Sequence, residues 1–350
     1  MPKTSSSQES KDATGGIMMI LSPAKTLDLD PLPNNHPEQD NYNQNIPDAT
    51  TFTMPDCHTE NTLRVVKSMK TRTQKELEKL LGISANLAKK SHEYWNDFQE
   101  DPTTSKDSKE TTLKPAIYAF SGAAYQGLQA LERSKDAILY MQNNLRIVDP
   151  VYGILKPLDQ MQAYRLEMAT RNLFDGNNGK KKKKNDNDDN KNALPSKLNV
   201  YWKDAVTQQL SSELATRPQD KRILLNLASD EYSAALDGTM LQKETPSAQY
   251  IKVVFRNEGR VIAVHAKRAR GLMVRYLAER QATTLEDVKQ FDLEGYKLVE
   301  DDEDDDDAST LIFDRPKQAP PAKAKAAGKK RAKDEEPTNK KKRSTRKRKL

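Results

Sequence analysis

Residues 261–275, VIAVHAKRARGLMVR, join an apolar run to a dense group of cations, and the interpretation of the second half of the chain depends on them. The run 261–264 predicts a buried strand, and the residues from His265 onward predict a helix. A second apolar run at 251–255 and the turn residues Asn257-Glu258-Gly259 between the two runs predict a β-hairpin. Cations that follow a core strand directly have a fixed geometry, so this segment predicts recognition of an anion.

The predicted helix has two faces. Its apolar positions recur at helical spacing and form a stripe that faces the core: Ala269, Leu272, Met273, Tyr276 and Leu277. Lys267, Arg268 and Arg275 fall on the opposite face, with Gly271 among them. Glycine inside a helix costs about 1 kcal/mol relative to alanine, and room for a phosphate beside the backbone is one reason to tolerate that cost. A solvated cationic helix face accounts for the same pattern.

Composition indicates a folded body with charged extensions. Of 350 residues only 35% are hydrophobic and 31% are charged, so we expect sizeable disordered parts. The net charge of +7 is unevenly distributed: residues 316–350 hold fifteen of the 58 Lys and Arg but three of the 51 Asp and Glu, which leaves the rest of the chain at −5. Any affinity of the folded body for a polyanion therefore requires a local basic patch.

Several classes of protein are disfavoured. Cys57 is the only cysteine and the four histidines show no ligand spacing, so we expect no disulfide, no metal centre and no cofactor. The chain contains no apolar run near the roughly 20 residues that span a bilayer, and residues 1–16 lack a signal-peptide pattern. We therefore expect a cytoplasmic or nuclear protein without a membrane partner, as a monomer.

Irregular alternation of strand and helix patterns predicts one α/β (α+β) domain over residues 17–315, with a mixed β-sheet surrounded by helices. Apolar runs at 17–21, 117–120 and 223–227 are among its expected strands. A low-complexity insertion is expected at 175–197 and an acidic loop at 300–307. Residues 1–16 and the basic tail 316–350 are expected to be disordered. The cation clusters of the tail, at 329–331 and 340–349, fit a bipartite nuclear-localisation pattern.

A second nucleic-acid signature lies at residues 77–90, LEKLLGISANLAKK. It resembles the helix-hairpin-helix motif at Leu81, Gly82, Ile83 and Ala88, although Ser84 stands where the second glycine usually falls. Backbone N–H groups at 82–84 would meet a DNA phosphate at the start of the second helix, where the helix dipole also favours an anion. The cations at 89–90, Lys89 and Lys90, add positive charge. An ordinary helical hairpin with Ser84 as its N-cap explains the same residues.

Six segments together resemble the YaaA-type peroxide stress proteins. They are 21–28 (LSPAKTLD), 118–128 (YAFSGAAYQGL), 145–159 (LRIVDPVYGILKPLD), 164–168 (YRLEM), 226–232 (NLASDEY) and 266–273 (AKRARGLM). The resemblance covers roughly residues 17–313. It implies a mixed sheet with helices around it, a positively charged cleft, a helix-hairpin-helix element, DNA binding, and protection against hydrogen peroxide linked to limiting free iron. The N-terminal segment, the insertion, the acidic run and the tail depart from the family.

Within these segments, three sets of charged residues have alternative roles. Lys25 follows a strand and Pro23, which places it at the edge of the sheet, facing a cleft or plain solvent. Arg165 and Glu167 alternate with apolar residues, as a ligand contact or as a pair that braces the fold. Asp230 and Glu231 follow a buried strand, where they could hold a metal, act in acid/base chemistry or cap a helix.

These observations lead to two hypotheses. In the first, the protein binds double-stranded or branched DNA through a set of cations and backbone donors: Lys25, Gly82, Ile83, Ser84, Lys89, Lys90, Arg165, Lys267, Arg268, Arg270 and Arg275. Contacts of this kind position a protein on phosphates without reading the sequence. In the second, the same cations bind a nucleotide-like or other anionic small molecule, and Glu167, Asp230 or Glu231 transfers protons. In a third possibility, the tail alone associates with chromatin.

Overall fold

The computed structural model describes residues 15–32, 53, 60–100, 113–174, 194–299 and 309–317. In these ranges seven strands form one mixed sheet in the order β4-β3-β1-β6-β7-β9-β8. The five inner strands run parallel: β3 (Leu145–Asp149), β1 (Met18–Leu21), β6 (Ile223–Leu227), β7 (Gln249–Asn257) and β9 (Thr310–Arg315). The edge strands β4 (Gly153–Leu155) and β8 (Lys297–Leu298) are antiparallel to their neighbours. The predicted single α/β domain with a mixed sheet is confirmed.

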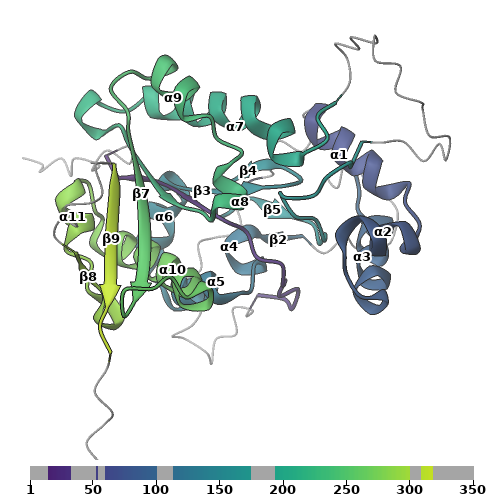
Figure 1. The fold of residues 1–350 in the computed structure, drawn as a ribbon, viewed down its shortest axis with the longest axis horizontal. Helices are drawn as coiled ribbons and strands as arrows, with labels where there is room; N and C mark the ends of the chain where they lie inside the picture. The colour runs from purple at the N-terminus through teal and green to yellow at the C-terminus, as the bar shows by residue number, and fades with distance from the viewer. Residues whose placement is uncertain are drawn as a thin grey trace, which may run out of the picture. The chain divides into compact units, whose positions relative to one another are not determined.

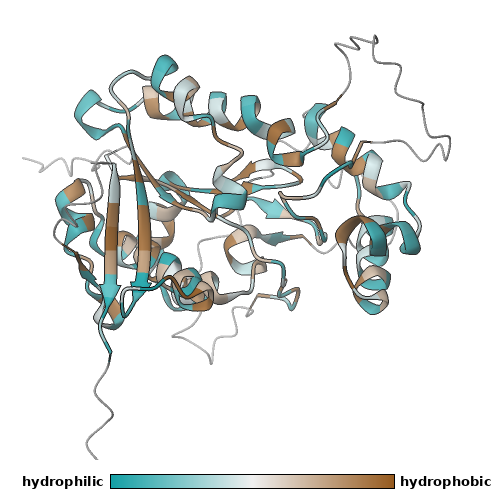
Figure 2. Ribbon diagram, in the orientation of Figure 1, coloured by the Kyte–Doolittle hydropathy of each residue, from teal (hydrophilic) through white to brown (hydrophobic). Residues whose placement is uncertain are grey.

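The inner strands are apolar because layers of structure cover both of their faces. Every residue of β1, β3 and β6 is buried, as expected for parallel strands between helices. Figure 2 shows β7 and β9 as largely hydrophobic strands with more hydrophilic ends. Strands β2 (Lys114–Pro115) and β5 (Gln160–Met161) form a separate antiparallel pair.

Helices cover the sheet on both sides. Figure 1 shows α7 (Leu198–Ala215) and α9 (Gly238–Glu244) on one side, and α5 (Ala123–Leu128) and α10 (Ala263–Arg280) on the other. Short helices complete the layers: α4 (Ala116–Ala119), α6 (Lys135–Asn144), α8 (Asp230–Ser233) and α11 (Leu285–Lys289). The helices α1 (Glu60–Lys70), α2 (Gln74–Leu81) and α3 (Ala85–Asp97) lie together beyond the β4 edge in Figure 1.

Two predicted strands are wrong. Residues 117–120 belong mainly to α4, because a four-residue apolar run fits a buried helical turn as well as a strand. Residues 261–264 form no strand either, and α10 begins at Ala263. The predicted hairpin is therefore absent from the described residues: β7 ends at Asn257, and a tight turn from Asn257 to Arg260 leads into the helix. β7 pairs with β9 instead, in parallel.

The predicted apolar stripe of α10 is confirmed, but Gly271 has a different role. Its backbone contacts α5: a Cβ built on Gly271 would lie 1.7 Å from the Ala124 carbonyl oxygen. Gly127 of α5 is equally constrained, since a Cβ there would lie 2.3 Å from the Arg268 carbonyl oxygen. The two glycines let the helix backbones touch. The space that the sequence assigned to a phosphate is therefore filled by α5.

A buried carboxylate ends β3. Asp149 is fully buried and accepts hydrogen bonds from the Val151 and Tyr152 amides at 2.8 and 2.9 Å and from the Tyr164 hydroxyl. Burial raises the pKa of Asp149 to about 6, although these hydrogen bonds oppose the shift. The carboxylate holds the turn after β3 and the segment 164–168 against each other.

Residues 1–14, 175–193, 300–308 and 318–350 lie outside the described residues. The predictions for the N-terminal segment, the insertion, the acidic loop and the basic tail fall almost entirely on them. No helix in the described ranges is long and apolar enough to cross a membrane.

Candidate functional site

A pocket of about 510 Å³ opens at the carboxyl ends of β1 and β6. Leu21 and Leu227, the last residues of these strands, are register partners, so both chains leave the sheet at the same place. Strand β1 lies between β3 and β6, so the strand order changes direction at β1. Open α/β sheets commonly bind ligands at the carboxyl ends of the strands at such a point. We call this cavity the strand-end pocket. Its charged and serine lining residues include Ser22, Lys25, Ser229, Glu231, Lys267 and Arg270.

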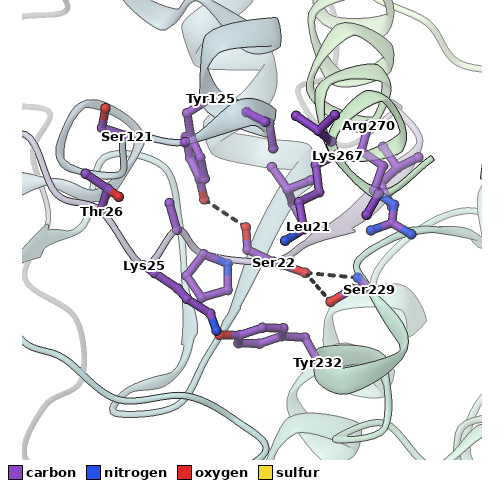
Figure 3. A pocket seen from close by; sticks show the side chains of 18 of the residues that line it. Leu21, Ser22, Lys25, Thr26, Ser121, Tyr125, Ser229, Tyr232, Lys267 and Arg270 are labelled. Carbon is purple, nitrogen blue, oxygen red and sulfur yellow. Dashed lines mark hydrogen bonds between the residues drawn. The ribbon is translucent and has the colours of Figure 1, made fainter. Parts of the chain in front are cut away.

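Hydrogen bonds between the strand ends fix the floor of the pocket. The Ser229 amide donates to the Ser22 hydroxyl at 2.9 Å, and the two hydroxyls lie 3.3 Å apart. The Tyr125 hydroxyl of α5 donates to the Ser22 carbonyl at 3.2 Å. Figure 3 shows these contacts in the middle of the pocket. The backbone around Ser22 is thus held from β6 and from α5 before any ligand binds.

Lys25 belongs to an ion-pair network on one wall. Its ammonium lies 2.6 Å from the Glu167 carboxylate, and Arg165 lies 3.4 Å from the other oxygen of the same carboxylate. The Arg165 guanidinium also donates to the Lys25 carbonyl at 3.0 Å. Two cations therefore share one acid, which leaves a local excess of positive charge. Glu167 braces the wall, one of the two roles that the sequence allowed.

Arg270 and Lys267 bring charge into the pocket from α10. Figure 3 shows both side chains extending from the helix toward the strand ends. Arg270 is half-buried, and it makes no hydrogen bond or ion pair with any residue in the described ranges; its Nε is fully buried without a partner. Burial lowers the pKa of Arg270, because the charged form loses hydration. Its buried Nε has no hydrogen-bond acceptor, so Arg270 favours an anion, although the Asp230 carboxylate also attracts its charge.

The other two arginines of the predicted cluster lie elsewhere. Arg268 donates to the Glu294 carboxylate through two nitrogens at 2.9 and 2.7 Å. Arg275 pairs with Glu279 at 3.2 Å and donates to Gln129. The structure therefore divides the four cations into a pair in the pocket and a pair engaged by acids on other faces of α10. The partner of Arg268 could not be predicted from local pattern because Glu294 is distant along the chain, whereas Arg275 and Glu279 are four residues apart on one helix.

The hairpin at 82–84 joins α2 to α3. Gly82 adopts a left-handed conformation (φ 60°) and ends α2, and the Ser84 hydroxyl accepts from the Leu87 amide at the start of α3. The Gly82 and Ile83 amides both donate to the Glu78 carbonyl, so they are not free donors for a phosphate. To bind a phosphate they would have to leave the Glu78 carbonyl, and their role as phosphate donors stays a prediction. The helical hairpin is present, and a helix-hairpin-helix function for it stays a prediction.

A second cleft of about 540 Å³ lies beside this hairpin, and we call it the hairpin cleft. Its charged lining residues are Arg72, Glu76, Lys79, Glu167 and Arg171. Lys89 and Lys90 are exposed on α3, where Lys90 lies 5.5 Å from the centre of the Tyr94 ring. The hairpin cleft thus has more cations than acids along its walls.

The linings of the two clefts meet at one ion pair. Glu167 lines the hairpin cleft, and its carboxylate is bonded to Lys25 of the strand-end pocket. The Trp95 indole of α3 also donates to the Arg165 carbonyl at 3.4 Å, which ties the hairpin to the segment that separates the clefts. Residues of the two signatures, at 77–90 and 261–275, therefore line two neighbouring clefts. We call the two clefts together the basic groove.

The acidic candidates are engaged in structural contacts. Asp230 is exposed at the start of α8 and pairs with Lys252 at 3.3 Å. Glu231 lines the strand-end pocket and accepts from the Ala169 amide at 3.1 Å. Both lie in the first turn of α8, where negative charge suits the helix dipole. No group of three His, Cys, Asp or Glu side chains within the described ranges is arranged to hold a metal ion.

Sequence reasoning missed some residues of the groove. Ser22, Ser229 and Tyr232 line the strand-end pocket, while Lys79 and Arg171 line the hairpin cleft. Both serines come just after buried apolar runs, and that position was a usable signal for the ends of parallel strands. The cations of the hairpin cleft had no such signal, because only the fold brings α2 against residues 167–172.

Comparison with known proteins agrees with this architecture. The family model described as "Peroxide stress protein YaaA" matches residues 17–302. A "UPF0246 protein" of Francisella tularensis subsp. novicida is 31% identical over 289 residues, covering 81% of this chain and 96% of that protein. A "UPF0246 protein" of Francisella philomiragia is 34% identical over 288 residues, covering 80% and 94%. The chain belongs to the YaaA family of peroxide stress proteins.

Proposed function

We propose that this peroxide stress protein binds DNA along the basic groove and shields it from oxidative damage. The observation that carries the proposal is the ion pair between Lys25 and Glu167, which links the lining of the strand-end pocket to that of the hairpin cleft. One cleft alone is large enough for a small ligand, whereas two neighbouring clefts with cations suit an extended polyanion. Lys25, Lys267 and Arg270 would neutralise phosphates at one end, and Lys79 and Arg171 at the other.

Binding of this kind is set by phosphate geometry rather than by base sequence. Arg165 supports the groove by holding the Lys25 carbonyl and sharing Glu167, and Lys89 and Lys90 extend the positive charge along α3. Double-stranded or branched DNA is therefore the expected partner. The limiting of free iron that the family resemblance implies is a separate expectation, to which the groove adds no argument.

The test is the salt dependence of DNA affinity in protein that ends at Lys317, which retains every strand of the sheet and lacks the basic tail. Each phosphate contact changes the slope of log K against log salt by about 0.9. The triple variant Lys25→Gln, Lys267→Gln, Arg270→Gln is expected to reduce the slope by about three. The double variant Lys79→Gln, Arg171→Gln is expected to reduce it by about two.

The matched control is Arg268→Gln with Arg275→Gln, which removes two cations from the same helix that are paired with Glu294 and Glu279. The slope of this control should equal that of the parent. If the control lowers the slope as much as the groove variants do, DNA follows another face of α10. If protein without the tail does not bind DNA, the tail is the only DNA-binding element.

A second candidate function is binding of a small anion, such as a nucleotide, in the strand-end pocket alone. The unpartnered guanidinium of Arg270 favours it, since a single phosphate or carboxylate would satisfy that group. Calorimetric titration of nucleoside monophosphates into protein without the tail tests this candidate. Saturable micromolar binding together with weak DNA affinity would support it against the DNA proposal.

A further inference from the structure

Three exposed aliphatic side chains lie at the start of α10, and one of them, Val264, lines the strand-end pocket. Val261, Ile262 and Val264 are 61%, 43% and 59% exposed, and they account for half of the large exposed hydrophobic residues in the described ranges. Single exposed apolar residues are common, but three within four positions form a local apolar surface. Val264 and Ala263 line the pocket itself, so this surface is continuous with it. We call Val261, Ile262 and Val264 the apolar triad.

The triad lies one helical turn from the cations of the pocket. Lys267 follows Val264 by three residues, and Arg270 follows Lys267 by three, so α10 presents an apolar tip and then two cations toward the same cavity. In Figure 3 these cations lie on one side of the pocket, and the Thr26 and Ser121 side chains lie on the other, with the end of β1 between them. The cavity thus combines a charged side, apolar walls that include Leu21 and Leu227, and hydroxyl groups.

A nucleotide has matching chemistry: a phosphate for the cations, a flat apolar base for the walls and polar edges for the hydroxyls. The pocket volume of about 510 Å³ lies in the range that accommodates a ligand of this size. The triad suits a nucleotide that is still part of a strand, because apolar side chains inserted between base steps unstack them. A free nucleotide would leave the triad without an apolar partner.

We propose that the strand-end pocket receives one unpaired nucleotide of bound DNA, while the apolar triad occupies the gap that this base leaves in the stack. The inference rests on the proposed DNA binding and specifies its substrate. The phosphate of the displaced nucleotide lies against Arg270 and Lys267. Extrusion costs least for a base that is already unpaired or damaged, so the protein prefers DNA with such a position over perfect duplex.

The experiment compares the affinity of full-length protein for a duplex with one unpaired nucleotide and for the fully paired duplex of the same sequence. The wild-type protein is expected to prefer the interrupted duplex by about tenfold or more. The variant Val261→Ser, Ile262→Ser, Val264→Ser is expected to bring this ratio close to one while affinity for the paired duplex changes little. These side chains are exposed, so their replacement leaves the core intact.

The matched control is Val200→Ser, which removes an exposed aliphatic side chain from α7, and its ratio should equal that of the wild type. Tight binding of both duplexes with a wild-type ratio near one would overturn the inference and leave DNA binding in place. Absence of any DNA binding would overturn the proposed function as well. Saturable binding of free deoxynucleoside monophosphate, with no preference between duplexes, would assign the pocket to a small molecule and also overturn the inference.

Discussion

Replacing Gly271 with alanine is expected to destabilise the protein, although alanine is the better helix former. By propensity alone the substitution would stabilise α10 by about 1 kcal/mol. In the fold, the new Cβ would lie 1.7 Å from the Ala124 carbonyl oxygen and 2.6 Å from its carbonyl carbon, whereas ordinary contact begins at 3.4 Å. These are backbone atoms of α5, so no side-chain rotation can relieve the clash, and the helices must move apart.

Overpacking of a filled interior typically costs about 1–3 kcal/mol. Because this clash involves backbone on both sides, we take about 3 kcal/mol as its cost. The gain in propensity offsets part of this, so the net loss is about 2 kcal/mol. For a folded body of this size, that corresponds to a fall of about 4–8 °C in Tm. Lys267 and Arg270 lie on the same helix, so a shift of α10 should also weaken the DNA binding that we propose.

Urea unfolding followed by circular dichroism measures the change in the free energy of unfolding. The matched control is Gly238→Ala in α9, where a Cβ meets nothing within 4 Å, so the change should be neutral or stabilising by up to about 1 kcal/mol. Gly127→Ala on the facing helix should be destabilising like Gly271→Ala, since its Cβ would lie 2.3 Å from a carbonyl oxygen. A Gly271→Ala protein as stable as the wild type would show that α5 and α10 do not touch at this point.

Two further predictions concern stability. Burial raises the pKa of Asp149 to about 6, so the native state binds a proton more tightly than the unfolded chain does. The free energy of unfolding should therefore fall by about 3 kcal/mol in total as the pH rises from about 4 through 6. Asp149→Asn should remove this part of the pH dependence of urea midpoints, and an unaltered profile would exclude Asp149 as its source. Thr73→Ala breaks the capping box with Glu76 at the start of α2 and should cost about 1 kcal/mol in urea unfolding. Equal stability of variant and wild type would contradict that role.

Local sequence was sufficient for the elements with an unambiguous pattern. The apolar runs at 17–21 and 223–227 correspond to β1 and β6, and the apolar stripe predicted from Ala269 to Leu277 belongs to α10. These patterns are reliable because a strand covered on both faces needs consecutive apolar residues, and a helix packed on a sheet needs a stripe. The runs at 117–120 and 261–264 are also apolar, but the first forms a buried helical turn and the second an exposed helix start. A run of four apolar residues is too short to show either the helical or the strand period, so its sequence alone does not distinguish a helix from a strand.

The sequence by itself determined the family, the mixed α/β domain, the basic character of α10 and the presence of a helical hairpin. Only the tertiary structure decided which cations act together: Lys267 and Arg270 share a cavity with Lys25, whereas Arg268 is paired with Glu294 and Arg275 with Glu279. The tertiary structure also placed α5 against Gly271, where the helical wheel alone predicted room for a phosphate. The physical reason is the difference in sequence separation between the contacts involved. Helix and strand patterns reflect contacts between near neighbours, but the charge and the free volume around a side chain depend on segments that are distant in sequence and adjacent in space.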